Sequence, residues 1–191
     1  MSAAGRRLPP GEVLFGFLRA VNLGKRNKVP MPDLMERLAA RGFPPIAYLL
    51  ASGNLAVAAG SDAAPALRAE LLAAIVEAYG VRTEVVFRTP GRLAELLRVD
   101  PFTPAGMRRV YVTLWDDEPD PEGLAALAAT DFSPDALHLV DGAAFMGYVD
   151  SSHDAKLSHA LVERRLKVPA TARNVNTFRR LLERFAPEEL A

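Results

Sequence analysis

The chain has 191 residues, 50% of them hydrophobic, and 23 basic residues balance 23 acidic ones. This apolar content excludes a disordered chain, and the balanced charge argues against a nucleic-acid coat protein, which is usually far more basic. The absence of cysteine excludes disulfides and thiolate metal sites and permits a reducing compartment.

The first half of the chain is predicted to alternate strands and helices. An apolar run rich in β-forming residues predicts a buried strand, and Pro32 and Gly42 suit the two ends of a following helix. The turn residues Ser52-Gly53-Asn54 separate two apolar runs and predict a hairpin. The expected elements are a strand at 13–21, a helix between Pro32 and Gly42, strands at 46–50 and 55–58, a helix at 64–79 and a strand at 81–88. This β-α-β-β-α-β order is that of ferredoxin-like folds.

The second half begins the same order again. Asp141-Gly142 is a strong hairpin signal, and an acidic loop follows the first strand. A helix expected at 90–97 precedes the second half, whose expected elements are a strand at 109–115, a helix at 123–129, strands at 136–140 and 143–149, and helices at 155–166 and 174–185. The order is β-α-β-β-α-α, so we expect the last strand of this half to be missing or replaced.

These elements predict an α+β fold made of two ferredoxin-like βαββα halves with an extra C-terminal helix. The repeated order suggests a duplication, although the two halves share no obvious sequence. We expect the first half at residues 12–98 and the second at residues 99–187, packed as one compact structural unit.

Polar and basic side chains gather in three segments, at 22–28, at 52–54, and at Lys156 with 171–177. In a right-handed β-α-β unit the first two strands run parallel and the hairpin-linked third strand returns between them, so the first two segments are expected at one end of the sheet. Backbone amides near Gly24 and the neighbouring cations suit an anion. The candidate ligand-binding residues are Arg19, Asn22, Lys25, Lys28, Ser52, Asn54, Lys156, Arg173 and Asn174.

Each segment also has a structural explanation. Asparagines and the Ser-Gly-Asn sequence are favoured in turns. Asn174 or Asn176 can cap the following helix, which typically contributes about 1 kcal/mol. Lys156 lies near the start of a predicted helix, where the dipole does not favour a cation, so it is expected to have a carboxylate or a bound anion as its partner.

Catalytic and metal-binding motifs are lacking. The histidines are His138, His153 and His159, without the spacing of a metal site, and no P-loop or nucleophile elbow is present. The acidic run at 116–120 could hold a divalent cation, but it lacks the calcium-loop spacing and is better explained as a solvated loop. We expect no metal and no cofactor, and whether the protein is an enzyme stays open.

Several specific motifs mark the chain: LRAVNLGKRNKVPM at 18–31, SGN at 52–54, PF at 101–102, KL at 156–157 and TARNVNT at 171–177. Together they resemble the signatures of the bacterial domain-of-unknown-function family 1697, over about residues 13–187. The resemblance implies an α+β fold with duplicated ferredoxin-like halves, and it implies no established reaction.

The chain departs from that family pattern at a few positions. Tyr48-Leu49-Leu50-Ala51 stands where the family usually has Thr-Tyr-x-Gln. Ala20 replaces a Gly, Ala155 replaces a Ser, and Val175 replaces a Trp. An activity that depended on that Gln, Ser or Trp would be absent from this protein.

Three functions are compatible with these observations. The first is a protein that binds an anionic small molecule, a nucleotide or RNA through the polar and basic cluster. The second is an enzyme of phosphoryl or glycosyl chemistry at the same cluster. The third is a protein-interaction module without a small ligand, which would expose a large apolar patch. The oligomeric state is open.

The N-terminal residues and the apolar runs bear on location. The first ten residues include Arg6 and Arg7 but lack the apolar stretch of a signal peptide. No apolar run approaches the roughly 20 residues that span a membrane. We therefore expect a cytoplasmic protein without a membrane partner.

Overall fold

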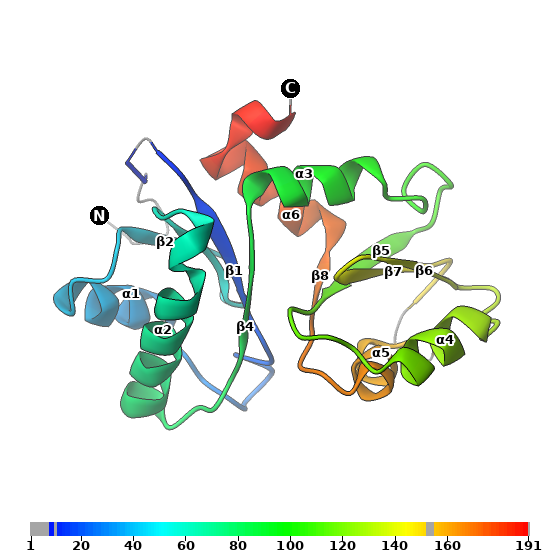
Figure 1. Ribbon diagram of the computed structural model, residues 1–191, viewed down its shortest axis with the longest axis horizontal. Coiled ribbons are helices and arrows are strands. Elements are labelled where there is room, and N and C mark those ends of the chain that lie inside the picture. The colour runs from blue at the N-terminus through cyan, green and yellow to red at the C-terminus, as the bar shows by residue number, and fades with distance from the viewer. Residues whose placement is uncertain (1–7, 10, 152–154, 191) are drawn as a thin grey trace. The chain divides into compact units, whose positions relative to one another are not determined.

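The computed structural model describes residues 8–9, 11–151 and 155–190 (Figure 1). The chain divides into two compact units: the described residues of Met1–Ala94 and Arg180–Ala191 form unit 1, and Glu95–Arg179 form unit 2. The division at residue 94 lies close to the boundary expected between residues 98 and 99, and the end of the chain groups with unit 1.

Unit 1 contains a four-stranded antiparallel sheet with the order β2-β3-β1-β4. Its elements are β1 (Leu14–Leu18), α1 (Met31–Ala40), β2 (Ile46–Leu49), β3 (Asn54–Val57), a 3-10 turn (Ser61–Ala63), α2 (Ala64–Tyr79) and β4 (Val85–Arg88). Because β1 and β2 each pair antiparallel with β3, they run parallel to each other, as predicted.

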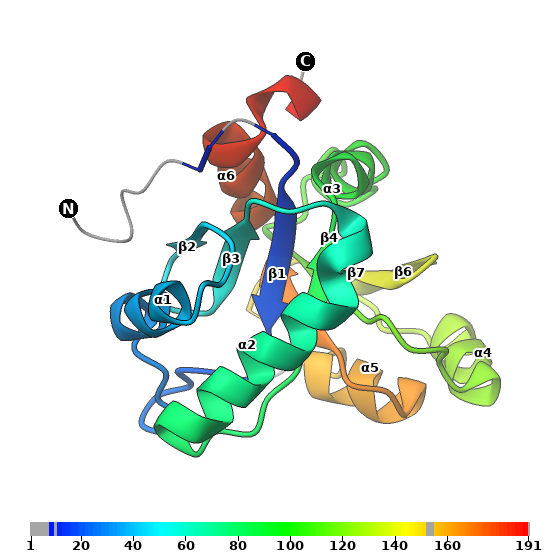
Figure 2. The ribbon, with the colours of Figure 1, turned by 60° about the vertical axis from the view of Figure 1, so that its left-hand side comes forward.

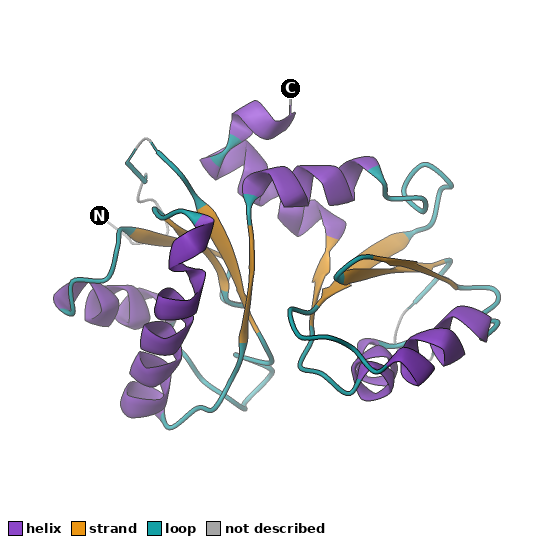
Figure 3. Ribbon diagram, in the orientation of Figure 1, coloured by secondary structure: helices purple, strands orange, loops and turns teal. Residues whose placement is uncertain are grey.

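Apolar side chains on the two helices hold α1 and α2 on one face of this sheet (Figures 2 and 3). Leu34 of α1 and Leu71 of α2 are fully buried in one core with Leu55 of β3. Within the sheet, every residue of β1 is buried. The ring of Phe15 lies 6.4 Å from that of Phe185, so the end of the last helix also packs on β1.

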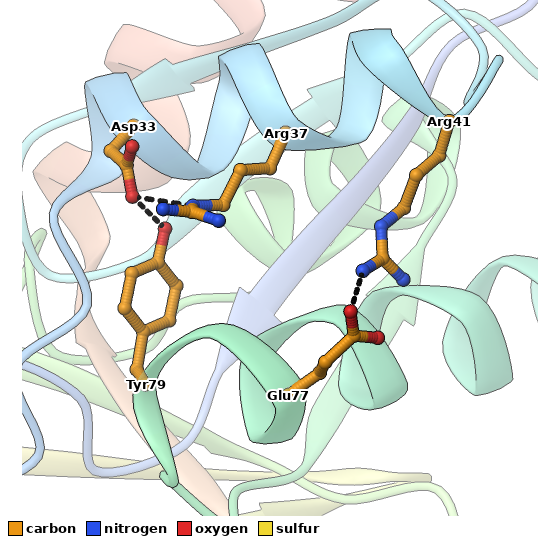
Figure 4. Close-up of polar contacts among 5 residues, drawn as sticks. All are labelled: Asp33, Arg37, Arg41, Glu77 and Tyr79. Atoms are coloured by element: carbon orange, nitrogen blue, oxygen red, sulfur yellow. Dashed lines mark hydrogen bonds and ion pairs between the residues drawn. The ribbon is translucent and has the colours of Figure 1, made fainter.

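A polar seam joins the two helices of unit 1 at the surface (Figure 4). The Tyr79 hydroxyl donates to the Asp33 carboxylate at 2.8 Å, and Arg37 Nε donates to the same oxygen at 2.7 Å. Just beyond α1, Arg41 forms an ion pair with Glu77 at 2.7 Å. These contacts orient α1 against α2, while the buried leucines supply the apolar packing.

Unit 2 repeats the topology of unit 1, with a sheet of order β6-β7-β5-β8. Its elements are β5 (Arg109–Leu114), α4 (Pro121–Ala129), β6 (Ala136–Val140), β7 (Ala143–Tyr148), α5 (His159–Leu166) and β8 (Thr171–Asn174). Helices α3 (Pro90–Arg98) and α6 (Val175–Phe185) contain the boundaries between the units, and a 3-10 turn (Pro187–Leu190) follows α6. Leu127 of α4 and Val162 of α5 pack against Met146 of β7.

The α+β prediction is confirmed, because both units show the element order β-α-β-β-α-β and the same strand order. Descent from a duplication stays a hypothesis that this shared topology motivates. The expectation that the second half lacks its last strand is wrong, since Thr171–Asn174 forms β8 and pairs antiparallel with β5.

Helix α5 is shorter than predicted. It begins at His159 instead of residue 155, because the Ser158 hydroxyl caps it by accepting a hydrogen bond of 3.2 Å from the Leu161 amide. Lys156 therefore precedes the helix, and the argument that placed this cation in the first helical turn no longer applies.

Candidate functional site

Two asparagines hold the loop after β1 in shape. Asn22 and Asn27 have φ values of 55° and 49°, a left-handed conformation that asparagine tolerates better than most residues. The Asn22 side chain donates to the Val29 carbonyl at 2.8 Å and accepts from the Val29 amide at 2.9 Å. The Asn27 side chain donates to the Ala20 carbonyl at 2.9 Å. These bonds close the loop on itself, so the turn interpretation of both asparagines is confirmed.

The loop is also joined to the β2–β3 hairpin. The Asn22 amide donates to the Ala51 carbonyl at 2.7 Å, and the Leu18 amide donates to the Gly53 carbonyl at 2.8 Å. Gly53 has φ 77°, and a Cβ atom there would lie 2.7 Å from Leu18 Cβ and 2.8 Å from Val21 Cγ2. The predicted proximity of segments 22–28 and 52–54 is confirmed.

Asn54 supports the hairpin from inside. It is fully buried, and its side-chain amide donates to the Leu49 carbonyl at 2.8 Å and to the Ser52 hydroxyl at 3.1 Å. Both amide protons therefore have partners within the hairpin, so Asn54 holds the turn and does not present its amide at the surface. Ser52 itself is exposed.

The outer side of this loop is basic. Lys25, Arg26 and Lys28 are exposed, and none of the three side chains has a hydrogen-bond or ion-pair partner among the described residues. We call residues 19–30 and 50–53 the basic loop surface; they contain four basic residues, including half-buried Arg19, and no acidic one. Leu23 and Leu50 on this surface are 61% and 45% exposed.

Unit 2 has an equivalent end, which the strand pairing identifies. The Trp115 amide donates to the Gly142 carbonyl at 3.3 Å, as Leu18 does to Gly53. Leu114 pairs with Ala143, just as Phe17 pairs with Asn54. Segments 115–120 and 141–142 are thus the counterparts of the basic loop surface.

That equivalent end has the opposite charge. Its two segments contain five acidic residues and no basic one. Asp120 among them caps α4, accepting from the Gly123 amide at 2.9 Å, and pairs with Lys167 at 3.0 Å. The Lys167 hydrogen bond and the Gly123 amide lower the pKa of Asp120 below its usual value. One topological position is therefore basic in unit 1 and acidic in unit 2.

Lys156 lies in unit 2 and is exposed. Its charge contributes to lowering the pKa of Asp131, after the larger effect of hydrogen bonds from Ser133. The partner expected for Lys156, a carboxylate or a bound anion, stays a prediction. Lys156 also lines a cavity of about 400 Å³ together with Asp135 and Ser133.

Arg173 and Asn174 belong to β8. The Arg173 guanidinium donates to the Thr171 hydroxyl and to the Ala172 carbonyl, both at 2.8 Å, and desolvation lowers the pKa of Arg173 to about 10. The side chain is therefore still charged at neutral pH. The Asn174 oxygen accepts from the Asn176 amide at 2.9 Å, so the expected cap of α6 is confirmed.

The structure thus brings together the candidates of unit 1, which are Arg19, Asn22, Lys25, Lys28, Ser52 and Asn54. Arg26, one of the cations expected beside Gly24, lies on the same surface between two of the candidate lysines. The exposed Leu23 and Leu50 were missed because an apolar residue in a loop carries no sequence signal for exposure.

Neither a metal site nor a membrane span is found in the described ranges. No group of three or more His, Asp or Glu side chains there could hold a metal ion, and His153 lies outside those ranges. Within the same part of the chain, every helix is too short or too polar to cross a bilayer.

Comparison with known proteins agrees with the motifs. The family described as a protein of unknown function (DUF1697) matches residues 13–145, and the chain belongs to this family. The match includes the basic loop surface and ends before Lys156. No curated protein matches the chain.

A solved structure shares the fold. The conserved bacterial protein SP0830 from Streptococcus pneumoniae superposes with a TM-score of 0.68 at 19% sequence identity, over 94% of this chain and 99% of that one. At this level of identity the similarity extends to the fold alone.

Proposed function

We propose that the protein binds a phosphate-bearing ligand, either a nucleotide or RNA, through the basic loop surface of unit 1. The observation that carries the proposal is the set of three exposed cations, without partners in the part of the chain that the structure describes, on a backbone that Asn22 fixes in place. A loop with a fixed backbone loses less conformational entropy on binding than a mobile loop, and phosphate oxygens accept hydrogen bonds from Lys and Arg side chains.

The proposed residues have two kinds of role. Lys25 and Lys28, with Arg26 and Arg19, supply positive charge, and the exposed Ser52 hydroxyl supplies a neutral donor. Asn22 and Asn54 position these groups. Three further candidates for anion contacts, Lys156, Arg173 and Asn174, belong to unit 2 and lie outside the basic loop surface; of these, Lys156 is exposed and lines a cavity.

Binding is favoured over catalysis because the surface lacks a base. Residues 19–30 and 50–53 contain no Asp, Glu or His, so they provide no carboxylate or imidazole to act as a general base at neutral pH. An enzyme of phosphoryl or glycosyl chemistry would need that group from elsewhere. We place the proposed binding in the cytoplasm, where the absence of cysteine is unremarkable.

The test is a triple variant, Lys25→Gln with Arg26→Gln and Lys28→Gln. Binding of the full chain to inorganic phosphate, ATP, polyphosphate and an RNA oligonucleotide is measured by calorimetry or fluorescence anisotropy at several salt concentrations. We expect the parent to bind at least one of these probes. In the triple variant, the plot of log K against log salt should become less steep, with the magnitude of its negative slope reduced by about 2.

The matched control removes the same charge elsewhere, through Arg164→Gln, Arg165→Gln and Arg180→Gln, three exposed residues. If the control weakens binding as much as the loop triple does, the attraction is not local to the loop. That result, or a parent that binds none of the four probes, would refute the proposal.

A further inference from the structure

The basic loop surface combines its cations with two exposed leucines. Leu23 follows Asn22 and Leu50 precedes Ala51, and these two neighbours are joined by the hydrogen bond of 2.7 Å. The leucines, 61% and 45% exposed, therefore flank the joint between the two loops. A single exposed leucine needs no explanation, but two at one joint beside three exposed cations make a surface that can form both charged and apolar contacts.

We propose that the ligand of this surface is an unpaired RNA strand, whose phosphates contact the cations and whose bases lie against Leu23 and Leu50. This inference rests on the proposed function, because it requires phosphate binding at the same surface. A single strand presents both the phosphate backbone and the apolar faces of its bases, whereas a duplex buries those faces in its stack. Polyphosphate offers the charge without any apolar group.

The placement of the cations and leucines on two adjoining exposed loops suits an extended ligand. Small ligands are held in clefts that bury most of their surface. Four cavities of about 320 to 510 Å³ are lined by residues outside the basic loop surface. The cations and leucines are instead exposed on two adjoining loops, where a strand can lie across both.

The equivalent end of unit 2 is not a second site for the same ligand. Segments 115–120 and 141–142 contain five acidic residues and no basic one, so they repel phosphates, and the cations of the proposed RNA contact are those of unit 1. Three or four cations then neutralise about three phosphates, which gives a slope of log K against log salt of about −2 to −3.

The test compares three probes with equal numbers of phosphates: a single-stranded RNA oligonucleotide, a blunt RNA duplex and inorganic polyphosphate. Anisotropy titrations of the full chain should show the single strand binding about tenfold more tightly than either competitor. The double variant Leu23→Ser with Leu50→Ser should remove that tenfold preference and leave the affinity for polyphosphate unchanged.

The control is Val76→Ser with Val149→Ser, which removes two other exposed apolar residues, 38% and 42% exposed. This control should keep the preference for the single strand. Thermal unfolding of each variant in the absence of ligand shows whether the fold is retained.

The outcomes separate the two proposals. Polyphosphate and duplex binding as tight as the single strand, or no effect of the leucine double variant, overturns the RNA inference and leaves phosphate binding intact. An acidic peptide that binds as tightly as the RNA overturns the inference in favour of a protein partner. Failure of every phosphate probe overturns both proposals.

Discussion

The Asn22 side-chain amide donates a hydrogen bond of 2.7 Å to the Ala51 carbonyl, joining the loop after β1 to the β2–β3 hairpin. The same side chain donates to and accepts from Val29 across the loop. One asparagine therefore determines both the shape of the basic loop and its position against the hairpin.

Replacing Asn22 by Gly tests this role without straining the backbone, because glycine accepts φ 55° freely. Three side-chain hydrogen bonds are lost, so the free energy of unfolding should fall by about 2 kcal/mol. Asn27→Gly loses one such bond at a similar φ and should cost less than half as much. Urea denaturation gives both values, and equal losses in the two variants would contradict the role of Asn22.

Gly53 is expected to tolerate no side chain. A Cβ atom there meets Leu18 Cβ at 2.7 Å, in a backbone with φ 77°. Gly53→Ala combines left-handed strain with overpacking and should destabilise unit 1 by about 3 kcal/mol. Gly24→Ala is the control, because its φ is 54° but no atom lies within 4 Å of the added carbon. It should cost about 1 kcal/mol from strain alone. If both variants lose the same stability in thermal unfolding, the close approach at Gly53 is unimportant.

Local sequence patterns predicted most helices and strands. The expected helix at 64–79 agrees with α2 at both ends, since an apolar stripe runs along it and Gly80, with φ 65°, terminates it. β8 was missed because its four residues show no apolar alternation and only Thr171 is buried. That strand forms because β5 offers an edge for pairing, and β5 lies far from β8 in the sequence, so a local pattern does not reveal the pairing.

The candidate site was predictable to a lesser degree. The expected connection between the two parallel strands correctly predicted that the loop and the hairpin lie together. The interior role of Asn54 could not be foreseen, because a polar residue between two apolar runs looks like an exposed turn residue. Its burial depends on the Leu49 carbonyl accepting from its amide.

Tyr79 gives the seam between α1 and α2 a pH dependence. Burial, and then the hydrogen bond to Asp33, raise the pKa of Tyr79 to about 12, above the usual value near 10. The phenol ionises at a lower pH in the unfolded chain than in the folded one. Its contribution to stability is therefore complete below about pH 10 and is lost as the pH rises from 10 toward 12.

The Tyr79→Phe variant isolates this contribution. It lacks the phenol, so the difference in unfolding free energy between parent and variant should shrink as the pH rises above 10. Urea denaturation at pH 8, 10 and 11.5 measures that difference, and an ultraviolet titration of phenolate follows the ionisation. A difference that stays constant over this range would show that Tyr79 has the same pKa in both states.

Gly123 provides a sharp test of packing in unit 2. Helix propensity predicts that Gly123→Ala stabilises the protein, whereas the close contact predicts that it destabilises the protein. It lies inside α4, where alanine is ordinarily favoured over glycine by about 1 kcal/mol. A Cβ atom at this position, however, would lie 1.8 Å from the Arg165 carbonyl oxygen on α5. The two helices approach so closely that the Asp120 amide also donates to the Leu166 carbonyl at 2.9 Å.

We expect Gly123→Ala to destabilise unit 2 by more than about 2 kcal/mol, because α5 must move as a whole to admit the methyl group. The control on the same helix is Ala125→Gly, an exposed position, which should cost about 1 kcal/mol through propensity alone. Two opposite exchanges in one helix would then both be destabilising, a result that propensity cannot produce. A neutral or stabilising Gly123→Ala in chemical denaturation would mean that α4 and α5 do not approach each other through this glycine.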